Sequence, residues 1–164
     1  MLEKLKKVYY KYKAFRFLNK DVKKKRIYVN GNCRFTRNCI IGNNCHFNGM
    51  VINGDGKVFI GDNFHSGTEC LVITQNHNYD LGESLPYDNT YIIKNVTIGK
   101  NVWLGSRVIL LPGTILEDGC IVQAGSVVHG KIPKLAIVGG NPAKVIKYRD
   151  ENHYIRLENA GLYS

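Results

Sequence analysis

Apolar residues recur every six positions along much of this chain. In the clearest run one apolar position repeats without a break: Ile98, Leu104, Leu110, Leu116, Val122 and Val128. Two residues before each of these stands a small or β-branched side chain: Val96, Val102, Val108, Thr114, Cys120 and Ser126. An amphipathic helix would need apolar spacings of three and four, which these runs lack. The pattern instead predicts short strands that each carry two inward side chains.

Two further runs upstream keep the same register. One comprises Val29, Phe35, Ile41 and Phe47, each preceded two positions earlier by Ile27, Cys33, Cys39 and Cys45. The other comprises Ile60, Ser66 and Val72, preceded in the same way by Val58, Phe64 and Cys70. The step from 47 to 60 is two periods plus one residue, and the step from 72 to 98 is four periods plus two. We expect loops to leave the repeat at these phase shifts, with a protruding loop over residues 74–95.

Glycine and asparagine stand between the predicted strands. Several of them supply residues that tolerate a positive φ at little cost: Gly99, Gly105, Gly113, Gly119, Gly125, Asn43, Asn44, Asn63 and Asn101. Three short strands closing a triangular coil would stack coil on coil around one continuous core. We therefore predict an all-β solenoid domain over 27–147, capped by a helical arm over 1–26 and a short helical tail over 148–164.

The cysteines fit this solenoid as core residues. All five (Cys33, Cys39, Cys45, Cys70 and Cys120) fall in one class of inward position, and none forms a CxxC pair. Buried free cysteine behaves as a small hydrophobe, so a catalytic thiol, a thiolate metal site and a disulfide framework are all disfavoured. An odd cysteine count, with no signal-peptide pattern, indicates a reducing, cytoplasmic setting.

Positive charge is concentrated in the first 26 residues. This segment holds eleven Lys or Arg against Glu3 and Asp21, a net charge of +9, whereas the other 138 residues carry +1. Its apolar residues recur at roughly helical spacing between the lysines: Leu2, Leu5, Val8, Tyr9, Tyr12, Phe15 and Phe17 or Leu18. The pattern fits either a helix that caps the first coil or an amphipathic helix on anionic lipid. No nucleic-acid-binding motif accompanies the charge, so we expect no nucleic-acid partner.

Four motifs occur in order in the second half of the chain: VWLGS over 102–106, LPG over 111–113, AGSVV over 124–128 and GNPAKVI over 140–146. In this combination the chain resembles the hexapeptide-repeat acetyltransferases, and among them the sugar and capsular-polysaccharide O-acetyltransferases. The resemblance implies a left-handed β-helix, a homotrimer with active sites between subunits, and acetyl-CoA as the co-substrate, with no metal. It covers residues 96–147 densely and 27–80 more loosely.

The resemblance also implies roles for individual residues. Trp103 and Ser106 match positions lining the cleft for the pantetheine arm, Gly105 lets the backbone approach closely, and Ala124 matches a backbone contact. Lys144 and Lys147 match basic positions near the phosphates of CoA, which suit flexible ammonium groups.

One histidine of five, His77, falls in the predicted 74–95 excursion, where similar acetyltransferases carry a histidine facing the neighbouring subunit's cleft. An imidazole can remove an alcohol proton at neutral pH, so we expect His77 to be the general base for direct attack on the thioester. Four nearby residues are candidates for orienting the ring or binding the acceptor: Asn76, Asn78, Asp80 and Glu69.

The acceptor is the open part of this interpretation. An asparagine that helps bind acceptor in galactoside-type enzymes corresponds to Gly67 here, and a Thr-Lys pair corresponds to His129-Gly130, leaving Lys131 as a substitute basic contact. The leading acceptor is a saccharide hydroxyl in surface-polysaccharide synthesis. If the basic arm lies on lipid, a lipid-linked saccharide at the inner membrane face would suit it. N-acetylation of an amino sugar and O-acetylation of an antibiotic stay as alternatives. Outside this class stand a structural trimer and a zinc carbonic anhydrase, whose closely spaced histidine pair is missing.

Overall fold

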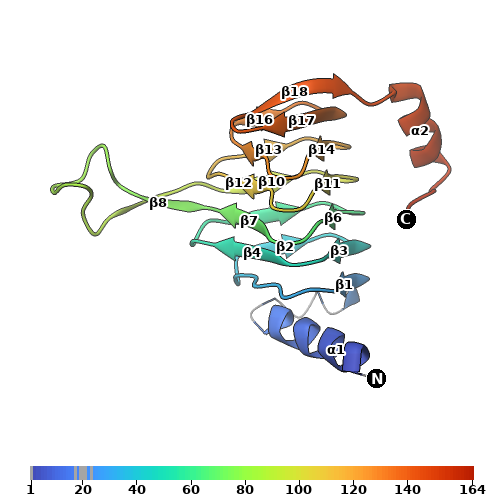
Figure 1. The fold of residues 1–164 in the computed structure, drawn as a ribbon, viewed down its shortest axis with the longest axis horizontal. Helices are drawn as coiled ribbons and strands as arrows, with labels where there is room; N and C mark the ends of the chain where they lie inside the picture. Colours follow the sequence, from blue (N-terminus) through green and yellow to red (C-terminus); the bar gives the residue numbers. More distant parts are fainter. Residues whose placement is uncertain (1, 17, 19–21, 23) are drawn as a thin grey trace.

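The computed structural model describes residues 2–16, 18, 22 and 24–164, with side chains from residue 5 onward. Three parallel sheets stack the short strands into a three-sided solenoid (Figure 1). Face A contains β1 (Ile27–Val29), β3 (Cys45–Phe47), β6 (His65–Ser66), β11 (Trp103–Leu104), β14 (Ile121–Val122) and β17 (Ala136–Gly140). Face B contains β4 (Met50–Asn53), β7 (Cys70–Ile73), β12 (Ile109–Leu110) and β15 (Val127–Val128). Face C contains β2 (Cys39–Ile41), β5 (Val58–Ile60), β10 (Val96–Ile98), β13 (Ile115–Leu116) and β16 (Lys131–Ile132).

The sixfold repeat is the cause of this architecture. The chain visits faces A, B and C in turn, so equivalent residues of successive coils lie in register, as Val58 does with Val96 and Ile60 with Ile98. The inward positions are buried in every coil, and all five cysteines are among them. The predicted solenoid and the buried cysteines are confirmed, and the hexapeptide repeat implies that the coils wind in the left-handed sense.

The turns between strands use two different devices. Asn44, Asn63 and Asn101 adopt φ of 55°, 56° and 58°, as predicted for residues that tolerate the left-handed region. Asn43, Gly99 and Gly105 do not adopt a positive φ, so the predicted reason is wrong for all three. Close packing explains the two glycines instead. They are needed because the next coil is too close for a side chain: a Cβ on Gly105 would lie 2.5 Å from the Ala124 backbone nitrogen.

The longer phase shift falls at the corner where face B meets face C, and the shorter one is the net of one residue missing between Phe47 and Ile52 and two residues added between Ile52 and Ile60 at that same corner. The shorter one lengthens the turn between β4 and β5, which holds Gly54, Asp55 and Gly56. The longer one is the predicted protruding loop, and it begins and ends as an antiparallel hairpin of β8 (Gln75–His77) and β9 (Tyr91–Ile93). Figure 1 shows this hairpin extending well away from the stacked coils.

The two ends of the solenoid are covered differently. α1 (Leu2–Phe15) lies across the first coil, where Ala14 is fully buried and Tyr10 and Phe15 pack on the core (Figure 1). Phe17, Lys20, Asp21 and Lys23 of the predicted basic arm lie outside the described residues. At the other end, β18 (Ala143–Tyr148) pairs antiparallel with β17 over the last coil.

α2 (Glu151–Asn159) follows β18 and runs beside the upper coils (Figure 1). The Asp150 side chain caps it by accepting a hydrogen bond from the backbone N–H of His153. Neither described helix is long and apolar enough to cross a membrane.

Candidate active site

The protruding hairpin holds His77 at the end of β8, directly opposite Tyr91 on β9. The Tyr87 ring stacks on the imidazole with 3.7 Å between ring centroids, and the Tyr91 ring lies 4.9 Å away at an angle of 37°. The imidazole Nδ1 is buried and has no hydrogen-bond partner within the described part of the chain. The two tyrosine rings therefore fix the plane of the imidazole, while no described polar group fixes its tautomer.

The predicted neighbours of His77 serve the hairpin more than the ring. Asn76 is exposed and, being next to His77 on a strand, projects from the opposite face. Asn78 donates from its side-chain amide to the Thr90 hydroxyl at 3.0 Å and accepts from the Leu81 backbone N–H, which closes the turn. Asp80 is exposed in the same turn.

Glu69 lies elsewhere, at the corner where face A meets face B. Its carboxylate accepts a hydrogen bond from Arg107 Nε at 2.7 Å, in a salt bridge with both side chains mostly exposed. The structure therefore does not bring Glu69 to the His77 ring within one chain.

The predicted cofactor residues gather along the A–B corner. Trp103 lies on the outer surface of face A with 54% of its area exposed. Gly105 and Ser106 form the turn that follows, and Ala124 stands one coil above them, with the Gly125 N–H donating to the Ser106 carbonyl at 2.9 Å. Because Gly105 has no side chain, the Ala124 backbone can lie directly against this turn.

Two lysines extend this column toward the end of the solenoid. β18 pairs with β17 so that Lys144 lies opposite Gly139 and Lys147 opposite Ile137, and both lysines are exposed. Lys131, the suggested substitute contact, instead lies on face C, where it forms a salt bridge with Glu117 at 2.7 Å. The column that runs from Trp103 to the two lysines therefore presents an exposed aromatic ring, two stacked turns and two exposed ammonium groups.

Within one chain, His77 and this column occupy different corners. The hairpin leaves the stack at the B–C corner, whereas Ser106 and Ala124 lie at the A–B corner. Along the stack axis they are close, since Leu71 of β7 pairs with Ile109 of β12, one coil apart. Adjacent strands are about 4.8 Å apart, so the two halves stand at nearly the same height on different edges of the prism.

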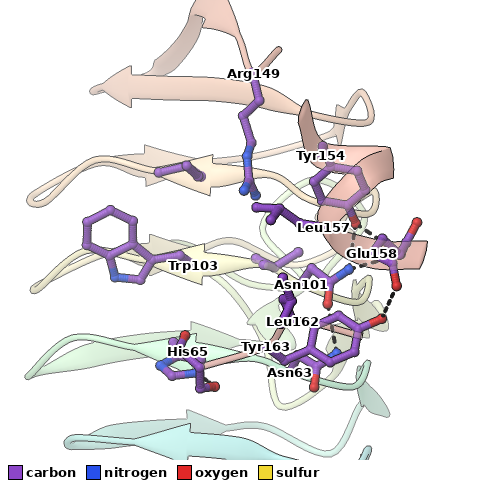
Figure 2. Close-up of a pocket in the computed structure, with 13 residues that line it drawn as sticks. Asn63, His65, Asn101, Trp103, Arg149, Tyr154, Leu157, Glu158, Leu162 and Tyr163 are labelled. Carbon is purple, nitrogen blue, oxygen red and sulfur yellow. Dashed lines mark hydrogen bonds between the residues drawn. The ribbon is translucent and has the colours of Figure 1, made fainter. Parts of the chain in front are cut away.

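A second feature, which the repeat pattern did not predict, adjoins Trp103. A groove of about 370 Å³ runs between face A and the C-terminal segment (the C-terminal groove). Figure 2 shows Trp103 on one side of it and Tyr154, Glu158 and Asn101 on the other. One sequence feature could have predicted this groove. Asparagine recurs at turn positions 44, 63 and 101, which places polar side chains in one line on successive coils, where the C-terminal tail could bind.

That asparagine line attaches the tail to the coils. The Asn44 amide donates to the Asn63 carbonyl oxygen at 3.0 Å, Asn63 to Asn101 at 2.8 Å, and Asn101 to the Tyr154 hydroxyl at 2.6 Å. The Lys100 ammonium lies 2.9 Å from the Glu158 carboxylate. Their mutual hydrogen bond is the main reason that the pKa of Glu158 is lowered and that of Lys100 raised.

The cysteines carry no sign of nucleophilic chemistry. Burial raises the pKa of Cys39 to about 12 and those of Cys45 and Cys120 to about 11. A thiol is reactive as the thiolate, which these sites disfavour near neutral pH.

Known proteins share this fold. The family described as "Bacterial transferase hexapeptide (six repeats)" matches residues 88–130. No curated protein sequence matches the chain. A maltose O-acetyltransferase from Clostridium difficile 630 is 28% identical with a TM-score of 0.69, covering 92% of this chain and 89% of that one. A galactoside acetyltransferase in complex with coenzyme A is 25% identical with a TM-score of 0.66, covering 93% and 84%.

A hexapeptide-repeat acetyltransferase from Vibrio cholerae O1 biovar eltor, complexed with acetyl coenzyme A, is 28% identical with a TM-score of 0.65. The match covers 72% of this chain, which spans only 64% of the length of that protein. The repeat, the order of the three faces and these structural neighbours agree: the chain has the fold of the hexapeptide-repeat acetyltransferases and is similar to them in sequence.

Proposed function

We propose that this protein is an acetyl-CoA-dependent O-acetyltransferase that acts on a hydroxyl group of a saccharide. The observation that carries the proposal is the column at the A–B corner, in which the exposed indole of Trp103 lies beside the stacked turns that hold Gly105, Ser106 and Ala124. Similar folds are named maltose and galactoside acetyltransferases, and two of the similar structures hold CoA or acetyl-CoA.

Each part of the column suits one part of the donor. The Ala124 backbone can bind the amide-rich pantetheine arm at close range, and the Trp103 ring provides an apolar wall. Lys144 and Lys147 stand nearest the end of the solenoid and can bind the phosphates as mobile point charges.

His77 is the proposed general base. The imidazole accepts the proton of the acceptor hydroxyl while the oxygen attacks the thioester carbonyl carbon. The C–O bond forms, the C–S bond breaks, and the imidazolium returns the proton to the departing thiolate, so no acyl-enzyme is needed. Stacking on Tyr87 holds the ring in position without hydrogen-bonding to either nitrogen. A backbone N–H of the A–B corner is the proposed donor to the oxyanion.

The two halves of this site must come from different chains. Since His77 and the column occupy different corners at similar height, a homotrimer with its threefold axis parallel to the solenoid would bring the hairpin of one chain to the column of the next.

We further propose that α1 contacts an anionic membrane surface. Leu5, Val8, Tyr9 and Tyr12 recur at helical spacing and are 60–73% exposed, on a helix whose other side packs on the first coil. Lysines flank this apolar stripe, which fits lipid of opposite charge. The site would then act at the cytoplasmic face, close to a lipid-linked acceptor.

Sedimentation with vesicles of phosphatidylglycerol, at low and high salt, tests whether α1 binds anionic lipid. Binding that persists in Val8→Glu/Tyr12→Glu would refute it.

The enzymatic proposal is tested by following thiol release from acetyl-CoA with two acceptor panels, hydroxyl-only sugars and amino sugars. We expect release with the first panel and a loss of about 100- to 10,000-fold in kcat for His77→Gln. Asn76→Ala, on the opposite face of the same strand, is the matched control and should retain activity. Release only with amino sugars would replace O-acetylation by N-acetylation, and full activity in His77→Gln would exclude the assigned base.

A further inference from the structure

The two departures from the sixfold repeat lie one above the other, and the shorter supports the longer. The Asp55 backbone N–H donates to the Gln75 side-chain oxygen at 3.1 Å, and the Gly56 N–H donates to the Thr74 hydroxyl at 3.1 Å. A Cβ on Gly54 would lie 2.6 Å from both side chains, so the turn sits tightly under the base of the hairpin. The two extra residues of this turn therefore shape the surface directly below the segment that holds His77.

That surface is a groove of about 440 Å³ at the B–C corner (the corner groove). Its polar lining comes from two successive turns: Arg34, Thr36, Arg37 and Asn38 from the lower, and Asn53 and Asp55 from the upper. The Asn38 amide donates to the Asp55 carbonyl at 2.6 Å and joins the two turns. The groove is thus built by the fold and framed by backbone that is held on both sides.

Its chemistry favours an anion. The lining contains two guanidinium groups and only one carboxylate. Neither arginine forms a salt bridge with an acidic side chain in the described ranges 5–16, 18, 22 and 24–164. Arg34 donates to the Asn53 side-chain oxygen, which fixes one edge of its guanidinium. The Thr36 hydroxyl is buried and has no hydrogen-bond partner among the described residues. Buried polar groups without a partner are rare, and a ligand oxygen would satisfy this one.

The groove also lies on the His77 side of the hairpin. Gln75 and His77 are two residues apart on β8, so their side chains project from the same face of the strand. The Gln75 side chain reaches down to Asp55 in the groove wall. Since a strand rises about 3.3 Å per residue, the imidazole stands about 7 Å farther out along the same face.

We infer that the corner groove binds the acceptor, and that the acceptor is an acidic saccharide whose carboxylate or phosphate group pairs with Arg37 and Arg34. A guanidinium binds either anion through paired N–H groups, which would hold the sugar with a hydroxyl toward His77. This inference rests on the proposed acetyl transfer for its biological meaning, but the binding itself can be measured without catalysis.

The test is isothermal titration calorimetry of the whole protein, saturated with CoA, using galacturonate, galactose, glucose 1-phosphate, glucose and inorganic phosphate. We expect at least one acidic sugar to bind about tenfold or more tightly than its neutral counterpart and than inorganic phosphate. Arg37→Gln should abolish that preference, and Thr36→Val, which keeps the shape, should weaken binding severalfold. Lys134→Gln removes the same charge from an exposed turn at the far end of the solenoid and should change nothing.

Equal binding of acidic and neutral sugars, an unchanged preference in Arg37→Gln, or exclusion of the acidic sugar by CoA would each overturn the inference. Thermal unfolding of Arg37→Gln and Thr36→Val verifies that both are folded. Preference for the acidic sugar in a protein that releases no thiol with any acceptor would support the groove and refute the proposed acetyl transfer, so the two failures are distinguishable.

Discussion

Two substitutions at Asn63 can separate the contribution of its side-chain hydrogen bonds to stability from the cost of its left-handed backbone conformation. Asn63 has φ of 56° and makes two side-chain hydrogen bonds, accepting from Asn44 and donating to Asn101. Its backbone N–H bonds to the Asn43 carbonyl at 2.9 Å, independently of the side chain. Asn63→Gly removes the two side-chain bonds and keeps the conformation free of strain. Asn63→Ala removes the same bonds and also places a Cβ in the left-handed region.

The expected losses follow directly. Two partly exposed hydrogen bonds contribute about 1 kcal/mol each, so Asn63→Gly should lower the free energy of unfolding by about 2 kcal/mol. The left-handed conformation costs an alanine roughly a further 1 kcal/mol, giving about 3 kcal/mol for Asn63→Ala. Denaturant unfolding at one fixed protein concentration measures both, since the stability of an oligomer depends on concentration. An alanine variant as stable as the glycine variant would refute the conformational part of this reasoning.

Three further outcomes are expected. Leu104→Ala empties a fully buried position and should cost about 3 kcal/mol of stability in the same unfolding assay. Gly105→Ala places a methyl group 2.5 Å from the Ala124 nitrogen, so it should raise the KM for acetyl-CoA about tenfold. Gly130→Ala, at the B–C corner and with nothing within 4 Å of the added carbon, should leave KM unchanged even if its φ of 69° lowers stability. Burial raises the pKa of Cys39 from 9.0 to about 12, so folding favours the neutral thiol. The contribution of this thiol to stability should be constant below pH 9 and should fall as the pH rises toward 12, which unfolding experiments across that range would measure.

The sequence was sufficient for the solenoid because sixfold spacing is a local property of the chain. Each inward residue, such as Ile98 or Leu104, repeats the environment of its neighbours one coil away, so the period alone predicts burial. Both phase shifts were visible for the same reason. The distinct role of Gly105 was not, since close approach by the next coil depends on stacking, and a glycine required for space looks the same in the sequence as one required for positive φ.

The candidate site could be predicted only in part. His77 stood out because a long excursion interrupts a strict repeat, and its stacking on Tyr87 depends on how the hairpin closes, which no spacing encodes. The C-terminal groove and the corner groove arise between segments far apart in sequence, such as Asn101 with Tyr154. The repeat shows which residues occupy equivalent positions, but it does not show which residues lie next to one another across a corner.

The shared active site is tested most directly by mixing two inactive variants. His77→Ala removes the proposed base, and Ala124→Trp fills the proposed donor column without touching the hairpin. In randomly mixed trimers at equal ratio, about one site in four would combine an intact His77 from one chain with an intact Ala124 from the next. We therefore predict that co-refolded protein regains about a quarter of wild-type thiol release. Mixed trimers, verified by co-purification of differently tagged chains, that stay as inactive as either parent would contradict the account.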